Sequence, residues 1–282
     1  MLRRVAYLTV TAVLCLGVGG CALNFLGFER RDAWRGQAER ACMAHKPQSY
    51  FVRQASAING RGTCGLDYPL KVQALEDGTI GVGPGATLNC PIKATLEYWM
   101  RHSVQPASFA YFGMPIVEIR QVSSYSCRTR NNKRGAALSE HAFGNAIDIA
   151  AFKLANGRVV TIKSGWRGRS DERAFLREVF ASACKTFKTT LGPGAAYHAD
   201  HFHVDLARHG KSGTSTYCKP KPSMTPPARP PFEGARYAAF PGQPRYGLAQ
   251  AYTGGISQPD QILLTEQPPS FEGSPFFSAK PR

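Results

Sequence analysis

Two stretches in the middle of the chain carry apolar residues at helical spacing. Between residues 94 and 104, Leu96, Trp99, Met100 and Val104 recur near i, i+3, i+4 and i+8, which predicts a short amphipathic helix. Residues 171–187 place a longer series of apolar side chains on one helical face. Ser170 is the expected N-cap of this second helix, and the acidic residues that follow suit its positive end.

Three further stretches read as strands: residues 116–125, 145–152 and 201–207. The order along the chain is then helix, strand, strand, helix, strand. This order predicts an α+β fold, with a small antiparallel sheet and flanking helices.

The N-terminal residues have the layout of an export signal. Residues 1–20 combine a basic start, an apolar run and small residues before Cys21, as in a secretory signal peptide. Val18-Gly19-Gly20-Cys21 resembles a bacterial lipobox, which implies a lipid anchor on Cys21; a plain signal peptide and an uncleaved anchor are the alternatives. We expect an exported, periplasmic protein, with a linker over residues 21–39.

The C-terminal part differs in composition from the rest. Residues 219–282 hold 13 of the 20 prolines and show no helical or strand periodicity. Such a composition cannot bury a core, so a disordered tail is predicted, with a wall-spanning or partner-binding spacer as the alternative. One domain over residues 40–218 remains.

Six cysteines lie in this domain: Cys42, Cys64, Cys90, Cys127, Cys184 and Cys218. An even number in an exported domain favours three disulfides, and no Cys-x-x-Cys spacing suggests a metal cluster. The sequence does not choose among the fifteen possible pairings.

The net charge of +16 indicates an anionic partner. Nucleic acid is not expected, because the protein is exported and its basic residues are scattered. Anionic cell-wall polymer or membrane lipid fits better, and the alternative is a basic surface that serves solubility alone.

Most histidines fall in two short segments that also contain aspartates. If residues 201–206 form a strand, its period of two places His201, His203 and Asp205 on one face, opposite an apolar core face. Asp148 alternates in the same way with Ile147 and Ile149. Two imidazoles and one carboxylate, with a fourth position left to water, predict a catalytic zinc ion. Histidines that are merely hydrogen-bonded within the core are the alternative.

The first segment carries a recognisable motif. Ser139-x-His141-x-x-Gly144-x-Ala146-x-Asp148 resembles the signature of zinc D-alanyl-D-alanine peptidases, whose wider clan includes lysostaphin-type enzymes and murein endopeptidases. The stretch from Cys64 to Asp205 also resembles the bacterial extensin-like C-terminal domain. The resemblance implies a peptidase-like fold in which His141, Asp148 and His203 bind Zn²⁺.

The same resemblance leaves the catalytic base open. Asp200 and His203 fit the Asp-x-x-His pattern of carboxypeptidases, in which the acidic residue is the base. His198, His201 and His203 fit the His-x-x-His-x-His pattern of endopeptidases equally well. Asp200 and His201 are therefore both candidates, with His198 as a substrate or transition-state donor.

Arg128 follows Tyr125-Ser126-Cys127 and resembles the arginine that contacts substrate in the carboxypeptidases. A guanidinium suits a substrate carboxylate, although Arg130 or Arg134 could serve instead. The expected function is zinc-dependent hydrolysis of peptidoglycan stem peptides or cross-links, as a carboxypeptidase or an endopeptidase. The alternatives are a non-catalytic peptidoglycan-binding module and a structural envelope protein.

Overall fold

The computed structural model describes residues 31–232. The predicted signal peptide, Cys21 and the tail from residue 233 onward lie outside the described residues.

A nine-stranded mixed sheet forms the centre of the domain, with strand order β1-β4-β5-β6-β7-β10-β9-β11 and β8 paired to β7. Two strand pairs, β5–β6 and β9–β11, are parallel and the others are antiparallel. The sheet is therefore larger than the expected small antiparallel sheet, and it is mixed rather than purely antiparallel. A separate two-stranded sheet joins β2 and β3. The strands are β1 (Val52–Gln54), β2 (Ile58–Asn59), β3 (Gly65–Leu66), β4 (Leu70–Leu75), β5 (Ile80–Leu88), β6 (Ile116–Ser123), β7 (Ala146–Leu154), β8 (Val159–Thr161), β9 (Thr189–Leu191), β10 (Phe202–Asp205) and β11 (Tyr217–Lys219).

The helices are α2 (Ala33–Met43), α3 (Cys90–Trp99), α4 (Gln105–Phe112), α5 (Ile162–Gly165) and α6 (Ser170–Thr186). The predicted helix over 94–104 starts too late, because Asn89 Oδ1 caps Ile92 N at 3.0 Å and Pro91 occupies the first turn. A π-helical turn over residues 100–104 then connects α3 directly to α4. Ser170 is the first helical residue of α6 rather than its cap, since Arg169 takes the N-cap position.

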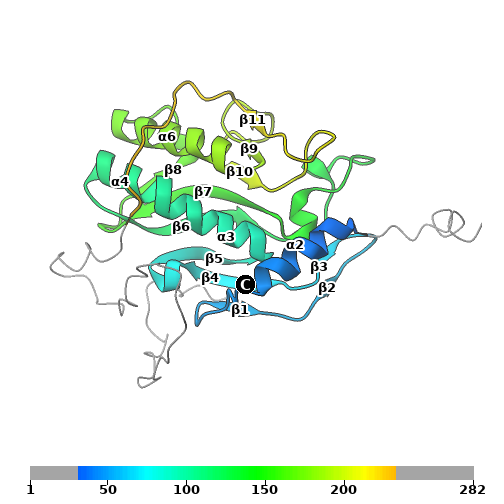
Figure 1. Ribbon diagram of the computed structural model, residues 1–282. Helices are drawn as coiled ribbons and strands as arrows, with labels where there is room; N and C mark the ends of the chain where they lie inside the picture. The colour runs from blue at the N-terminus through cyan, green and yellow to red at the C-terminus, as the bar shows by residue number, and fades with distance from the viewer. Residues whose placement is uncertain (1–30, 233–282) are drawn as a thin grey trace, which may run out of the picture.

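The main core lies between the sheet and the layer formed by α3 and α6, which Figure 1 shows in front of the strands. Aromatic rings dominate it: Trp99 meets Phe152 and Phe187, and Phe180 meets Phe202. The buried Trp99 indole donates to Ser182 Oγ at 2.9 Å, so its one polar atom is satisfied.

Three disulfides crosslink the domain, as the cysteine count predicts. Cys42–Cys90 ties α2 to α3, Cys64–Cys127 ties two loops together, and Cys184–Cys218 ties α6 to β11. Their sequence separations of 48, 63 and 34 residues correspond to about 4 kcal/mol each in lost entropy of the unfolded chain. Disulfides of this kind indicate an oxidising, extracytoplasmic compartment.

Both boundaries of the folded unit extend beyond residues 40–218. Helix α2 begins at Ala33, within the expected linker, and residues 219–232 follow the helical layer instead of leaving it (Figure 1). Arg229 Nε of this segment bonds Glu178 Oε1 of α6 at 2.7 Å, and the Phe232 ring stacks on Phe109 of α4. Among residues 31–232, none of the helices has the length and apolar character needed to cross a bilayer.

Candidate metal centre

Two residues of the candidate centre come from a pair of adjacent strands. In the antiparallel pair β7–β10, Asp148 lies directly opposite His203. The flanking residues Ile147, Ile149, Phe202 and Val204 are buried in the core with α6. Alternation along each strand therefore turns Asp148 and His203 to the other face of the sheet, where cross-strand side chains can touch.

The third residue comes from the short 3-10 turn over Glu140–Phe143, which precedes β7. Ser139 caps this turn by accepting from His141 N, and Gly144 ends it with φ of 56°. A Cβ atom at Gly144 would stand 2.2 Å from Leu66 Cδ2, so both the backbone angle and the space require glycine. The motif residues Ser139 and Gly144 thus hold the turn that presents His141.

Three potential ligand atoms converge in the space between these side chains. His141 Nε2 lies 3.1 Å from Asp148 Oδ2 and 3.2 Å from His203 Nδ1, and His203 Nδ1 lies 2.8 Å from Asp148 Oδ1. Ligands about 2.0–2.1 Å from a tetrahedral Zn²⁺ are separated by about 3.3 Å. The group could therefore hold a metal ion of this kind with small adjustments.

Hydrogen bonds on the outer side of each ring favour the tautomers that a metal needs. His141 Nδ1 lies 2.6 Å from the carbonyl oxygen of Ser124, and His203 Nε2 lies 2.9 Å from Asp205 Oδ2. Both outer nitrogens must carry the proton, because their partners only accept. The inner nitrogens then present lone pairs to each other and to a carboxylate, an arrangement that a proton or a cation must balance.

In the metal-free protein, the balancing proton is on His203. Burial opposes the charged imidazolium, but hydrogen bonds to Asp148 and Asp205 outweigh it and raise the pKa of His203 to about 10. Burial likewise opposes the charged Asp148, but the adjacent imidazoles of His141 and His203 hold the pKa of Asp148 well below its usual range.

The two candidate bases are linked to each other. His201 Nδ1 and Asp200 Oδ1 are 2.8 Å apart, while His201 Nε2 faces the centre at 3.8 Å from Asp148 Oδ1. The Asp200 carboxylate is 59% exposed and turns to His201 rather than to the centre. His201 lies one residue before the start of β10, and its ring reaches the ligand group.

His198 and Arg128 lie at the same centre. The His198 ring lies 5.0 Å from that of His201 and 5.7 Å from that of His203, between centroids. Burial lowers the pKa of His198, so its imidazole is neutral at pH 7. Arg128 directs a guanidinium nitrogen to 3.7 Å from Asp148 Oδ2. Arg130 and Arg134, the alternatives to Arg128, are exposed and make no ion pair with a described residue.

Two supporting contacts escaped the sequence analysis. The sequence predicts Asp205 on the same face as His203, but it does not predict the hydrogen bond between His203 Nε2 and Asp205 Oδ2. Arg35 lies in the expected linker, yet it bonds both carboxylate oxygens of Glu140 at 2.6 and 2.8 Å, beside His141. The Asp205 contact has a signal in the sequence, because an acid two residues after a strand histidine lies on the same face. The Arg35–Glu140 contact has none, because its partners are 105 positions apart.

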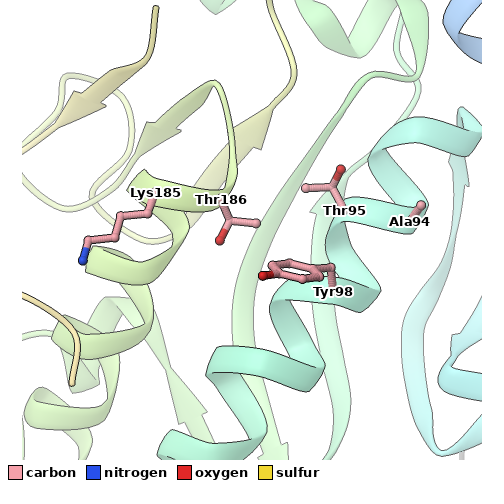
Figure 2. A pocket seen from close by; sticks show the side chains of 5 residues that line it. All are labelled: Ala94, Thr95, Tyr98, Lys185 and Thr186. Atoms are coloured by element: carbon pink, nitrogen blue, oxygen red, sulfur yellow. The ribbon is translucent and has the colours of Figure 1, made fainter. Parts of the chain in front are cut away.

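A hollow elsewhere on the surface, of about 520 Å³, lies between α3 and the end of α6. Figure 2 shows Tyr98 and Thr186 facing it, whereas Lys185 extends away. It contains no histidine, carboxylate or thiol, so we assign the candidate chemistry to the His-Asp group.

The comparisons with known proteins give a family and no individual relative. No curated protein and no solved structure matches the chain. The family described as extensin-like protein C-terminus matches residues 40–219, well over half of the sequence. The chain therefore belongs to the extensin-like protein C-terminus family.

Proposed function

We propose that the protein is a zinc-dependent hydrolase of amide bonds in peptidoglycan peptides. The observation that carries the proposal is the convergence of His141 Nε2, Asp148 and His203 Nδ1 within about 3 Å, with both outer ring nitrogens tied to acceptors. Such a set of lone pairs is costly to bury unless it binds a cation.

The donor set favours zinc over other common metals. Two imidazoles and one carboxylate are typical of catalytic zinc sites, whereas Mg²⁺ and Ca²⁺ prefer oxygen ligands. All six cysteines of the described residues are in disulfides, so a thiolate site is not available there. Bound zinc would supply Lewis-acid chemistry, acidifying a water molecule and polarising the scissile carbonyl.

We assign the proton transfers to His201. Its Nε2 faces the ligand group, and the bond between Nδ1 and Asp200 fixes the ring orientation. Asp200 is then a positioning residue, and His201 takes a proton from water and delivers it to the leaving amine. The sequence predicts His198 as a donor, but His198 Nδ1 lies 2.6 Å from the carbonyl oxygen of Ala196, which only accepts. The neutral ring therefore presents Nε2 as a hydrogen-bond acceptor, and we assign it no donor role toward the developing charge.

Arg128 is the proposed contact for a substrate carboxylate. Its guanidinium lies beside Asp148 and is 24% exposed, so it can reach both the centre and an incoming ligand. Stem peptides end in carboxylates, and a guanidinium can bind one through two parallel hydrogen bonds. This contact would orient the peptide with its last amide bond at the centre.

The substrate class rests on three supports. The motif around His141 resembles that of D-alanyl-D-alanine peptidases, the disulfides indicate an oxidising compartment, and the net charge of +16 suits an anionic polymer. A peptidase of the cell envelope meets all three conditions.

Purified protein loaded with zinc should convert muropeptides to shorter stem peptides, detected by mass analysis. His141→Ala should retain less zinc and give no product. His201→Gln should retain zinc but lose at least about 100-fold in rate, as expected for a lost general base. If the fully metallated wild type leaves every muropeptide unchanged, the hydrolase proposal is wrong and a binding or structural role replaces it.

A further inference from the structure

A group of positive side chains lies between β8 and the first half of α6. Lys163 and Arg167 belong to α5 and the turn after it, and Arg173 and Arg177 lie one helical turn apart on α6. We call these four residues the cationic surface. Lys163, Arg167 and Arg173 are exposed, and Arg177 is half-buried.

Among the described residues, no carboxylate forms an ion pair with the cationic surface, and Asp200 lies near enough to Lys163 only for that charge to lower its pKa. The acids nearest in sequence, Asp171 and Glu172, bind Arg158 at 2.9 and 2.6 Å, and Asp171 also binds Arg169. Burial lowers the pKa of Arg177, and the charges of Arg173 and Arg167 lower it further. Like charges gathered without counter-charges destabilise the fold, so a ligand that supplies negative charge would relieve the repulsion.

Two of the guanidinium groups are held in place. Arg177 stacks over the buried Trp166 ring at 3.8 Å, and Arg173 Nη1 donates to the carbonyl oxygen of Gly168 at 3.5 Å. A guanidinium that is already oriented loses less entropy on binding than a free one. Fixed guanidinium groups are suited to binding carboxylates.

The cationic surface is connected to the candidate metal centre. Strands β8 and β10 pair with successive parts of β7, with Thr161 opposite Ala151 and Phe202 opposite Ile149, so the start of α5 lies beside the start of β10. A hydrogen bond from His201 lowers the pKa of Asp200, and the charge of Lys163 contributes to the same shift. Lys163 therefore lies close to the Asp200–His201 pair.

We propose that the cationic surface binds carboxylate-bearing strands of the polymeric substrate and leads them to the histidines at the start of β10. This inference rests on the proposed function for the identity of the polymer. A substrate with many carboxylates would contact the cationic surface and the metal centre together, which raises its effective concentration at the centre.

The test is co-sedimentation of the full chain with purified peptidoglycan sacculi, after zinc has been removed with a chelator. Arg167→Gln/Arg173→Gln should weaken binding about tenfold, as expected for two lost surface ion contacts. The matched control is Arg40→Gln/Arg53→Gln, which removes the same charge from exposed positions on α2 and β1 and should change binding less than about twofold. Circular dichroism checks that both variants fold.

Two further probes make the outcomes decisive. Wild-type binding should fall when the carboxylates of the sacculi are amidated, and it should weaken as salt increases. The proposal is overturned if the two double variants change binding to sacculi equally, or if neither changes it. Undiminished binding to amidated sacculi would also overturn it. The proposal would also be overturned if Arg167→Gln/Arg173→Gln weakened binding to phosphatidylglycerol vesicles but not to sacculi. The cationic surface would then be a membrane-binding surface. Because zinc is absent throughout, a failure of hydrolysis leaves these results interpretable.

Discussion

At the scale of single residues, the candidate centre depends on which nitrogen of each histidine carries a proton. Asp205 fixes this for His203, because its Oδ2 accepts from Nε2 at 2.9 Å and leaves Nδ1 facing Asp148. An acid in this position also makes the imidazole a stronger ligand. We therefore expect the strand alternation that places Asp205 beside His203 to affect metal affinity as well as the position of the ring.

We expect Asp205→Asn to lower zinc affinity by about 10- to 100-fold, because the neutral amide supports His203 less well than a carboxylate. Competition with a chromophoric chelator measures this affinity. Asp77→Asn is the matched control, since Asp77 is exposed in a turn that has no contact with the centre, and it should leave the affinity unchanged. If the wild type, Asp205→Asn and Asp77→Asn bind zinc with equal affinity, Asp205 does not support the metal centre.

The raised pKa of His203 predicts how zinc changes stability with pH. Its folded-state pKa of about 10 exceeds the unfolded value of about 6.5, so the metal-free protein has this stabilisation in full below pH 6.5 and loses it towards pH 10. Zinc requires the unprotonated ring. The increase in melting temperature on adding zinc should therefore grow from pH 6 to pH 9, as scanning fluorimetry of stripped and loaded protein can show. An increase independent of pH would exclude His203 as a ligand.

At the scale of elements, helix α2 holds the turn that carries His141. Arg35 lies between the rings of Trp34 and Phe143 and bonds both oxygens of Glu140, which also accepts from Asn145 Nδ2 at 2.6 Å. The Arg35 and Glu140 side chains are only 10% and 7% exposed. Removing one partner would leave the other as a buried, uncompensated charge.

Arg35→Ala should therefore destabilise the protein by about 3 kcal/mol and weaken zinc binding through movement of the His141 turn. Urea unfolding of the metal-free protein and chelator competition measure the two effects separately. Arg40→Ala, an exposed change on the same helix, should alter neither. Unchanged zinc affinity in a destabilised Arg35→Ala protein would show that α2 supports the fold but not the metal centre.

How far the sequence predicts an element depends on how local its causes are. The strands β7 and β10 and the helix α6 are predictable because each alternates or repeats against one core. Strand β5 is not, because Gly81, Gly83, Pro84 and Gly85 interrupt its pattern and its pairing with β4 and β6 is a tertiary effect. The motif identifies His141, but the contact from Arg35 depends on how α2 packs, which no short pattern records.

At the scale of the whole molecule, residues 219–232 are part of the folded unit although their composition predicts disorder. Prolines restrict the unfolded chain, so an extended segment loses little entropy when it packs. Several contacts hold it. Arg229 binds the buried Glu178 of α6, which also accepts from the Tyr111 hydroxyl at 2.8 Å. Phe232 stacks on Phe109, and its backbone N–H donates to the carbonyl oxygen of Arg101 at 2.9 Å. The segment therefore covers a carboxylate that needs a counter-charge.

Truncation after residue 219 should lower the melting temperature by several degrees relative to truncation after residue 232, because Glu178 loses its cation. We expect the free energy of unfolding to fall by about 1–2 kcal/mol, which is less than for a fully buried ion pair, since Arg229 is 27% exposed. Calorimetry of the two truncated chains measures the difference. Adding Glu178→Gln to the shorter chain should recover much of it, because a neutral amide costs less to bury without a partner. Equal melting temperatures of the two truncated chains would show that residues 220–232 lie on the helices without stabilising them.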